Sequence, residues 1–251
     1  MLRRRIVPCL DVRGGRLVKG VNFEALRDCG DPVDAAERYA GQGADEIVWL
    51  NISAGEEDWR GLLDAVEQAA ERVDVPLCVG GGVADAEHGR ELLLAGADKV
   101  SSNTAPLHRP ALIEELADRF GTQCVVVAID AARDGEGGWQ AFASAGRRAA
   151  GRDAIQWARE SVERGAGELL VTSIDSDGTL GGYDLELLRA ICESVPVPVV
   201  ASGGAGRPEH LAAALEAGAQ AALAASIFHD GRHTISEVKE EVNRWGLPVR
   251  R

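Results

Sequence analysis

The sequence has 251 residues, of which 45% are hydrophobic and only 4% aromatic. This length suits one large domain or two small ones, and the apolar content is enough for a sizeable core. The net charge of −13 argues against nucleic acid as a partner and against a basic membrane-binding face. A phosphorylated ligand would therefore have to be held by local groups rather than by a basic surface.

The cysteines are odd in number and scattered, and they form no CxxC pair or metal-ligand spacing. We therefore expect reduced thiols in the cytosol. The opening MLRRRIVPCL is basic, but its apolar run is too short for a signal peptide. No stretch reaches the length of a transmembrane helix. These features predict a cytoplasmic protein that does not associate with membranes.

Strand-like and helix-like patterns alternate along the whole chain, and no Pro/Gly/Ser-rich linker divides them. Amphipathic stretches at 31–43 and 86–96 separate short apolar runs, which indicates an α/β protein with a parallel sheet. About eight such units predict a single (β/α)8 TIM barrel domain over residues 1–251. The predicted strands, in chain order, are Ile6–Val12, Glu46–Ile52, Leu77–Gly80, Lys99–Ser102, Cys124–Ala131, Glu168–Ile174, Val199–Ser202 and Ala221–Ser226.

The two halves of the sequence resemble each other. GGVADAEHGRELLLAGA begins at Gly81, and GGAGRPEHLAAALEAGA begins 122 residues later at Gly203. GADEIVWLNI at Gly43 and GAGELLVTSI at Gly165 have the same offset. A repeat of this length predicts two half-barrels related by a two-fold axis.

One aspartate ends an apolar, strand-like run in each half, Asp11 in CLDVRGG and Asp130 in AIDAARDG. Burying a lone carboxylate is costly and shifts its pKa. The C-terminal strand ends of a barrel form its active-site face, so both aspartates would face one mouth from opposite sides. A strand-end aspartate can also be a helix cap or turn former, but the symmetric pair favours acid/base chemistry.

Glycine pairs end the third and seventh predicted strands, in VGGGV (79–83) and SGGAG (202–206). Glycine lets backbone N–H groups approach an anion closely. The following strands end in SSNTA (101–105) and AASIF (224–228), where a new helix would attract phosphate. One Gly-Gly pair would indicate only a tight turn, but two copies in register predict two phosphate cradles for a bisphosphorylated substrate. The first cradle is Gly82, Asn103 and Thr104, and the second cradle is Gly204, Ala225 and Ser226.

From end to end, the chain resembles the cyclase subunits of imidazole glycerol phosphate synthase. The motifs that carry the resemblance are CLDVRGGRLVKGVNFEALRDCGDPV, VGGGV, GADKVSSNTA, VVVAIDA, ERGAGELLVTSIDSDGTLGGYD, ASGGAG and AALAASIFH. The sister isomerase of histidine synthesis shares the half-barrel pattern but typically lacks KGVNFE…GDPV and GADKVS.NTA. The resemblance implies that ammonia converts a ribulosyl-formimino aminoimidazole carboxamide bisphosphate into imidazole glycerol phosphate and aminoimidazole carboxamide ribotide.

The resemblance also implies roles for individual residues and no metal or organic cofactor. Asp11 and Asp130 would be the acid/base pair, and Phe23 would lie with Lys19 on a lid loop after strand 1. The five histidines are dispersed along the sequence and do not suggest a metal site. The substrate contacts that the resemblance adds to the two cradles are Lys19, Thr172, Asp177 and Gly178.

A glutaminase partner is a further implication of the resemblance. It would dock at the N-terminal face of the barrel and supply ammonia through the interior, as a separate subunit, because GLPVRR at the end of the chain leaves no room for a fused one. The residues alone also allow a salt-bridge cluster that closes the barrel base, and the two interpretations are compatible. In the family, a ring of charged residues lies at the base of the barrel, and the residues of this chain that match it are Arg5, Glu46, Lys99 and Glu168. The residues that match the family's partner-facing positions are Asp98 and Gln123.

Three places depart from the family pattern. The usual LDITAS after strand 2 is LNISAG, so Asn51 replaces an aspartate, and Leu180 stands where a lysine usually follows DGT. A Gly-Gly-Arg and Thr-Gly pattern is replaced by SAGRRAAGR (144–152). These changes leave two alternatives open: a diverged paralogous sugar-phosphate isomerase or cyclase, and a non-enzymatic barrel that only binds and activates a glutaminase.

Overall fold

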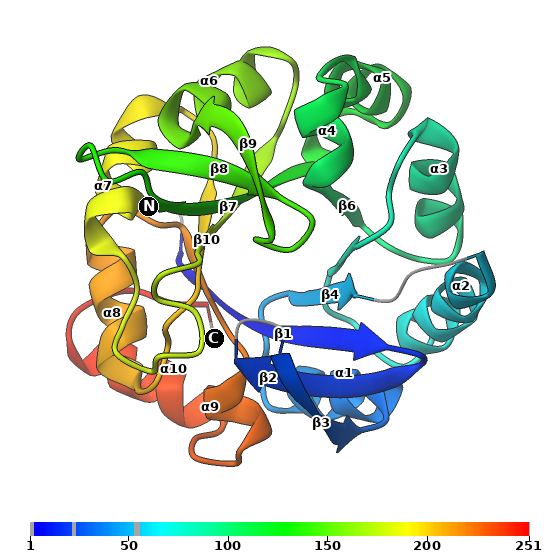
Figure 1. The fold of residues 1–251 in the computed structure, drawn as a ribbon. Coiled ribbons are helices and arrows are strands. Elements are labelled where there is room, and N and C mark those ends of the chain that lie inside the picture. The colour runs from blue at the N-terminus through cyan, green and yellow to red at the C-terminus, as the bar shows by residue number, and fades with distance from the viewer. Residues whose placement is uncertain (1–2, 22–23, 53–55, 251) are drawn as a thin grey trace.

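The computed structural model of the chain describes residues 3–21, 24–52 and 56–250. Eight parallel strands close into a barrel, with helices around them (Figure 1). The ring is closed because the last strand pairs with the first and the two halves join through β7 and β10. In ring order the strands are β1 (Arg5–Arg13), β4 (Ile47–Asn51), β5 (Leu77–Gly80), β6 (Lys99–Ser102), β7 (Val125–Arg133), β10 (Glu168–Ser173), β11 (Val199–Ser202) and β12 (Ala221–Ala224). The predicted TIM barrel is confirmed, and β5, β6 and β11 have the predicted bounds.

Helices form the outer layer because they present apolar faces to the strands, and several of them begin at a residue whose side chain caps the first turn. The Asp31, Asp85, Asp153 and Asp184 side chains accept N–H groups from the first turns of four helices, which satisfies otherwise unpaired donors. The long helices are α1 (Pro32–Gly41), α2 (Glu56–Ala70), α3 (Ala86–Leu94), α5 (Ala111–Phe120), α6 (Ala154–Glu163), α7 (Leu185–Ser194), α8 (Pro208–Glu216) and α10 (Ile235–Arg244). The short ones are α4 (Thr104–His108), α9 (Ser226–His229) and the 3-10 helix η1 (Thr122–Cys124).

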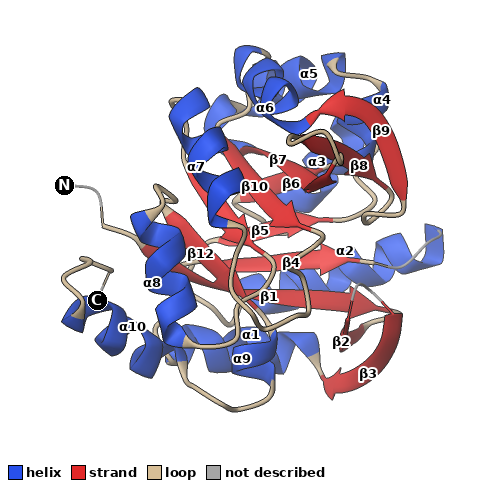
Figure 2. Ribbon diagram, turned by 60° about the vertical axis from the view of Figure 1, so that its left-hand side comes forward, coloured by secondary structure: helices blue, strands red, loops and turns tan. Residues whose placement is uncertain are grey.

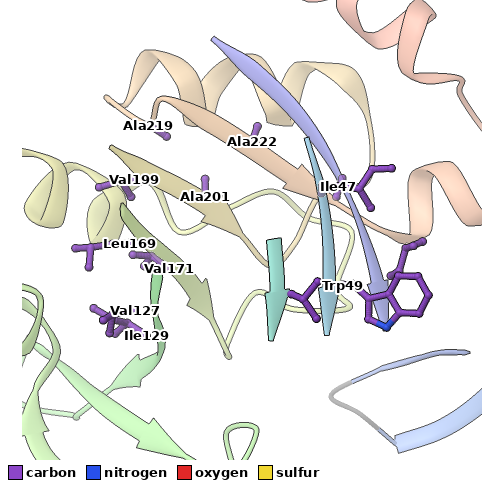
Figure 3. Packing of buried hydrophobic residues seen from close by; sticks show 14 of the residues in the cluster. Ile47, Trp49, Val127, Ile129, Leu169, Val171, Val199, Ala201, Ala219 and Ala222 are labelled. Carbon is purple, nitrogen blue, oxygen red and sulfur yellow. The ribbon is translucent and has the colours of Figure 1, made fainter. Parts of the chain in front are cut away.

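Side chains alternate along each barrel strand between two hydrophobic layers. Trp49 and Val171 point outward into the layer between strands and helices, part of which Figure 3 shows. Val48 and Leu170 belong to a separate cluster that fills the barrel interior. Truncating a fully buried side chain such as Trp49 to alanine typically costs about 3–5 kcal/mol. The packed interior leaves the strand ends as the place for chemistry.

Two antiparallel hairpins extend the barrel and were not predicted. Strands β2 (Arg16–Val21) and β3 (Glu24–Gly30) follow β1, and strands β8 (Trp139–Ala143) and β9 (Arg148–Asp153) follow β7. Both hairpins lie at the end of the barrel away from α10 (Figure 2). Because β1 and β7 continue into these hairpins, Asp11 and Asp130 precede the strand ends and face Val18 and Phe142 in the antiparallel pairing. The prediction that they end their strands was wrong by two or three residues.

Local conformations match between the two halves of the chain. Gly81 and Gly203 both have φ 91°. Asn103 (φ −117°, ψ −71°) and Ala225 (φ −121°, ψ −70°) nearly coincide as well. These matches support the predicted internal repeat, which stays a prediction, as does the single-domain assignment. Among the described residues, no helix is both long enough and apolar enough to cross a membrane.

Candidate active site

A cavity of about 700 Å³ opens at the C-terminal ends of the barrel strands. It is lined by every residue that the sequence placed at the mouth and that the structure describes. These are Asp11, Lys19, Gly82, Asn103, Thr104, Asp130, Thr172, Asp177, Gly178, Gly204, Ala225 and Ser226. Residues from both halves of the chain therefore share one site. Phe23, the other predicted lid residue, lies outside the described residues.

Asp11 is buried on β1 and faces a cation. The Lys19 Nζ lies 3.5 Å from its Oδ2, and the Cys9 thiol lies 3.7 Å from Oδ1. Burial raises the pKa of Asp11, Lys19 opposes that effect, and Asp177 adds to it. Burial also lowers the pKa of Lys19, but Asp11 and Asp177 more than offset this and leave it raised. Lys19 therefore stays charged and favours the ionised form of Asp11. It lies on strand β2, which corrects its predicted place on a loop.

Asp130 occupies the matching position on β7 with a neutral partner. The Asn103 Nδ2 donates to its Oδ2 at 2.8 Å. Burial raises the pKa of Asp130 to about 7, while the Asn103 and Gly146 hydrogen bonds oppose that rise and Asp177 adds to it. A carboxyl group with such a pKa can both hold and release a proton near neutral pH.

The glycines at the mouth bring backbone segments into close approach. A Cβ on Gly81 would lie 1.9 Å from the Asn51 carbonyl oxygen, and one on Gly204 would lie 2.0 Å from the Gly182 carbonyl oxygen. Both also have positive φ, which glycine adopts without strain. The two loops therefore require glycine, and they leave backbone groups next to the cavity.

A second charged site lies at the opposite end of the barrel. Arg5 bonds to both Glu46 and Glu168, and the Lys99 Nζ lies 2.9 Å from Glu46 and 2.6 Å from Glu168. We call these four residues the base ring. Each side chain of the ring contacts two side chains of opposite charge. Burial alone would raise the pKa of Glu168, but Arg5 and Lys99 outweigh this effect and leave the pKa lowered. The predicted salt-bridge cluster is confirmed.

The two predicted partner-facing residues are exposed near the base ring. The Asp98 carboxylate accepts the Leu77 N–H at 2.9 Å, and the Gln123 amide donates to the Phe120 carbonyl at 3.3 Å. Both contacts fix the chain where strands begin. Their exposure is compatible with a docking face, and a contact with a partner stays a prediction.

Sequence reasoning missed several residues that line the cavity. Ser144, Ala145 and Leu180 line it with φ values of 57°, 55° and 59°, a left-handed conformation that is uncommon outside glycine. Arg13 and Arg147 also line it. The family departures at 51, 180 and 144–147 therefore all fall within the site. In the sequence, Leu180 and the segment 144–152 stood out only as departures from the family pattern, and Arg13 gave no signal.

The fold and this geometry define a (β/α)8 barrel with a carboxylate pair between two glycine loops at its mouth. A family model described as "Histidine biosynthesis protein" matches residues 5–234. The chain is 54% identical over 250 residues to "Imidazole glycerol phosphate synthase subunit HisF" of Gluconacetobacter diazotrophicus, covering all of this chain and 97% of the relative. It is 55% identical over 250 residues to the protein of the same description from Exiguobacterium sibiricum, covering all of both.

The chain therefore belongs to the histidine biosynthesis protein family and, within it, to the HisF subunits of imidazole glycerol phosphate synthase. The predicted cyclase subunit, an enzyme of histidine biosynthesis, is confirmed over the paralogous and non-enzymatic alternatives. In the described part of the chain, no cluster of three or more His, Cys, Asp or Glu side chains is placed to hold a metal ion.

Proposed function

We propose that this chain uses ammonia to convert a ribulosyl-formimino aminoimidazole carboxamide bisphosphate into imidazole glycerol phosphate and aminoimidazole carboxamide ribotide. The observation that carries the proposal is the pairing of Asp11 and Asp130 in one cavity, each with a different partner. The reaction adds an amine to a carbonyl, breaks a C–N bond and closes a ring with loss of water. Each step moves protons, so two carboxyl groups in different protonation states suit it.

The two aspartates divide the proton transfers. Asp130, with a pKa of about 7, acts as the general acid that protonates the departing groups. Asp11, whose charged form Lys19 favours against the effect of burial, accepts protons from the attacking amine. Lys19 also lies on the hairpin that borders the mouth, where closure over the substrate would exclude water. Asp177 lines the same cavity and adds negative charge that stabilises developing cations.

The substrate lies across the mouth, with one phosphate in each cradle. In the first cradle, Gly82 has φ 86°, and Asn103 and Thr104 follow strand β6. Gly204 and Ser226 take the equivalent places beside β11 and β12. Crystals soaked in phosphate should contain one anion at each cradle. A single anion, with the other cradle closed, would contradict the bisphosphate assignment.

A glutaminase subunit supplies ammonia from the face that carries the base ring. Between this ring and the mouth, the interior holds small or medium side chains such as Val7, Cys78 and Val200, so only a small molecule could pass. Asp98 and Gln123 lie exposed on this face. The five free cysteines support a cytoplasmic setting for the complex.

Ammonium-dependent turnover tests the chemistry without any partner. The purified chain should convert the bisphosphate substrate when ammonium salt is added at high pH, where free ammonia is abundant. Product formation should require both the substrate and ammonium. Absence of turnover by well-folded protein would contradict the proposed function.

A variant of the base ring tests the ammonia route. Lys99→Ala should keep near-normal activity with ammonium, which enters at the mouth, and lose coupling of glutamine hydrolysis to product formation when the glutaminase is present. Lys239→Ala is the matched control, because it removes another buried lysine, bound to Asp45 at 2.7 Å, outside the ring. Equal loss of both activities in Lys99→Ala would show that Lys99 only stabilises the fold.

A further inference from the structure

A short left-handed turn joins β8 to β9 at the edge of the cavity. Ser144, Ala145 and Gly146 have φ values of 57°, 55° and 77° in succession, and the Arg147 N–H closes the turn on the Ser144 carbonyl at 3.4 Å. Non-glycine residues enter this conformation singly and at an energetic cost. Such strain persists only where the surrounding structure imposes it, and it is concentrated at functional sites.

Contacts with the proposed site impose this turn. The Ser144 N–H donates to the Thr104 Oγ1 at 2.9 Å, and the Gly146 N–H is directed at the Asp130 carboxyl group. A Cβ on Gly146 would lie 3.2 Å from the Ile174 side chain, so this side chain packs directly against the turn. The turn is thereby fixed to one phosphate cradle and one carboxylate at the same time.

The contact with Ser144 also orients the Thr104 hydroxyl. A threonine hydroxyl has one proton to donate and two lone pairs that accept. Because one lone pair takes the Ser144 N–H, the proton points away from that side of the oxygen. Thr104 itself lines the cavity, so its hydroxyl is free to donate to an anion there.

Three cations line the cavity, namely Arg13, Lys19 and Arg147. Lys19 is bound to Asp11, whereas Arg147 forms no salt bridge with any described residue. Arg147 directly follows the turn that contacts Thr104. The cavity also holds the carboxyl groups of Asp11, Asp130 and Asp177, so a doubly phosphorylated substrate needs a further positive charge.

We propose that Arg147 binds a phosphate of the substrate at the first cradle, beside Gly82 and Thr104, and that the left-handed turn holds it there. This assignment rests on the proposed function. The ligand group is a phosphomonoester dianion, whose oxygens accept paired N–H bonds from a guanidinium group. Apolar Leu180 and acidic Asp177 border the second cradle, where they lie against the glycine loop at 203–206. The two cradles are therefore unequal, and the first is the stronger anchor.

Arg147→Gln tests the assignment, and Arg148→Gln is the matched control. Arg148 is adjacent and exposed but does not line the cavity. We expect Arg147→Gln to bind inorganic phosphate about tenfold more weakly at the first cradle by calorimetry. The KM for the bisphosphate should rise by a similar factor, with kcat within about twofold. Arg147→Lys should recover part of the binding, and Arg148→Gln should match the wild type.

Several results would overturn the assignment. One is equal phosphate binding and KM in Arg147→Gln and Arg148→Gln, and another is the same loss from Arg13→Gln instead. A lowered unfolding temperature with reduced kcat and unchanged KM would show a structural role. If the wild type binds phosphate through Arg147 but does not turn over the substrate, the proposed function fails and the phosphate site stands. If turnover is normal and Arg147→Gln changes nothing, only the assignment of Arg147 fails.

Discussion

The two halves of the barrel mouth differ in whether a positively charged side chain contacts the buried aspartate. On the β1 side, Lys19 is bound to the carboxylate of Asp11. On the β7 side, Asp130 has the neutral amide of Asn103, and Arg147, which lines the cavity, directly follows the turn that contacts Thr104. The strands and loops beneath these residues match closely in conformation.

This contrast shows how one backbone arrangement can support two chemical roles. Burial raises the pKa of both aspartates, but only Asp11 has a cation that favours its charged form. A pair of carboxyl groups whose surroundings separate their pKa values identifies an acid and a base. The barrel thus repeats its geometry while the side chains from the two hairpins differ.

The largest expected effect comes from removing either carboxylate. Asp11→Asn and Asp130→Asn should each lower ammonium-dependent kcat by about 10²–10⁴-fold, the usual contribution of a general acid or base. Phosphate binding should survive, because the cradles remain. The exposed Asp118→Asn on α5 serves as a control with full activity. A variant that retains more than about half of the wild-type rate would exclude its residue from proton transfer.

The pH profile tests which partner controls which aspartate. Asn103 lowers the pKa of Asp130 against the effect of burial, so Asn103→Leu should raise that pKa above 7. The limb of the kcat–pH profile near pH 7 should then move to higher pH. Lys19→Met should raise the pKa of Asp11 instead and leave that limb in place, because Lys19 does not contribute to the pKa of Asp130. If Lys19→Met moved this limb and Asn103→Leu did not, Asp11 would be the acid and Asp130 the base.

Stability should reveal the burial of Asp130 directly. Its folded pKa of about 7 exceeds the ordinary 3.8, so the native state binds more protons between these values and loses stability as pH rises through about 7. Asp130→Asn removes this penalty and should raise the free energy of unfolding by roughly 1–4 kcal/mol at pH 8. Chemical denaturation at pH 4 should show little difference. An equal gain at both pH values would mean that ionisation of Asp130 is not responsible.

The smallest effect should come from adding a charge to the weaker cradle. Leu180 lines the cavity beside Gly178 and Asp177 and already has the left-handed backbone that a lysine would inherit. Leu180→Lys should lower the KM for the bisphosphate about twofold to fivefold at low salt, as for a partly exposed charge pair. Leu94→Lys, at a position that is 72% exposed, controls for net charge. A KM that falls equally in both variants would show a general electrostatic effect.

Apolar patterns predicted the eight barrel strands, because strands buried on both faces read as continuous apolar runs. The hairpin strands escaped, since charged residues and glycine interrupt the apolar residues of RLVKGV and RAAGRD, and each strand is stabilised by antiparallel pairing with its neighbour in the chain. Glycine motifs located two loops of close backbone approach at the mouth, and the role of these loops as phosphate cradles stays a prediction. The strained turn could not be predicted, because Thr104, Asp130 and Ile174 impose it from outside. The contact between Lys19 and Asp11 likewise depends on the register of β2.

Strand β9 has a further consequence, which concerns solubility. Among the described strands it pairs only with β8, so its other edge offers free N–H and C=O groups on which a second molecule could add a strand. Arginines at 148 and 152 flank this edge, and Gly151 breaks its extended line with φ 67°. Two like charges and a kink in six residues disfavour the approach of an identical strand. The hairpin can therefore project into solvent at the mouth without making crowded copies of the protein aggregate.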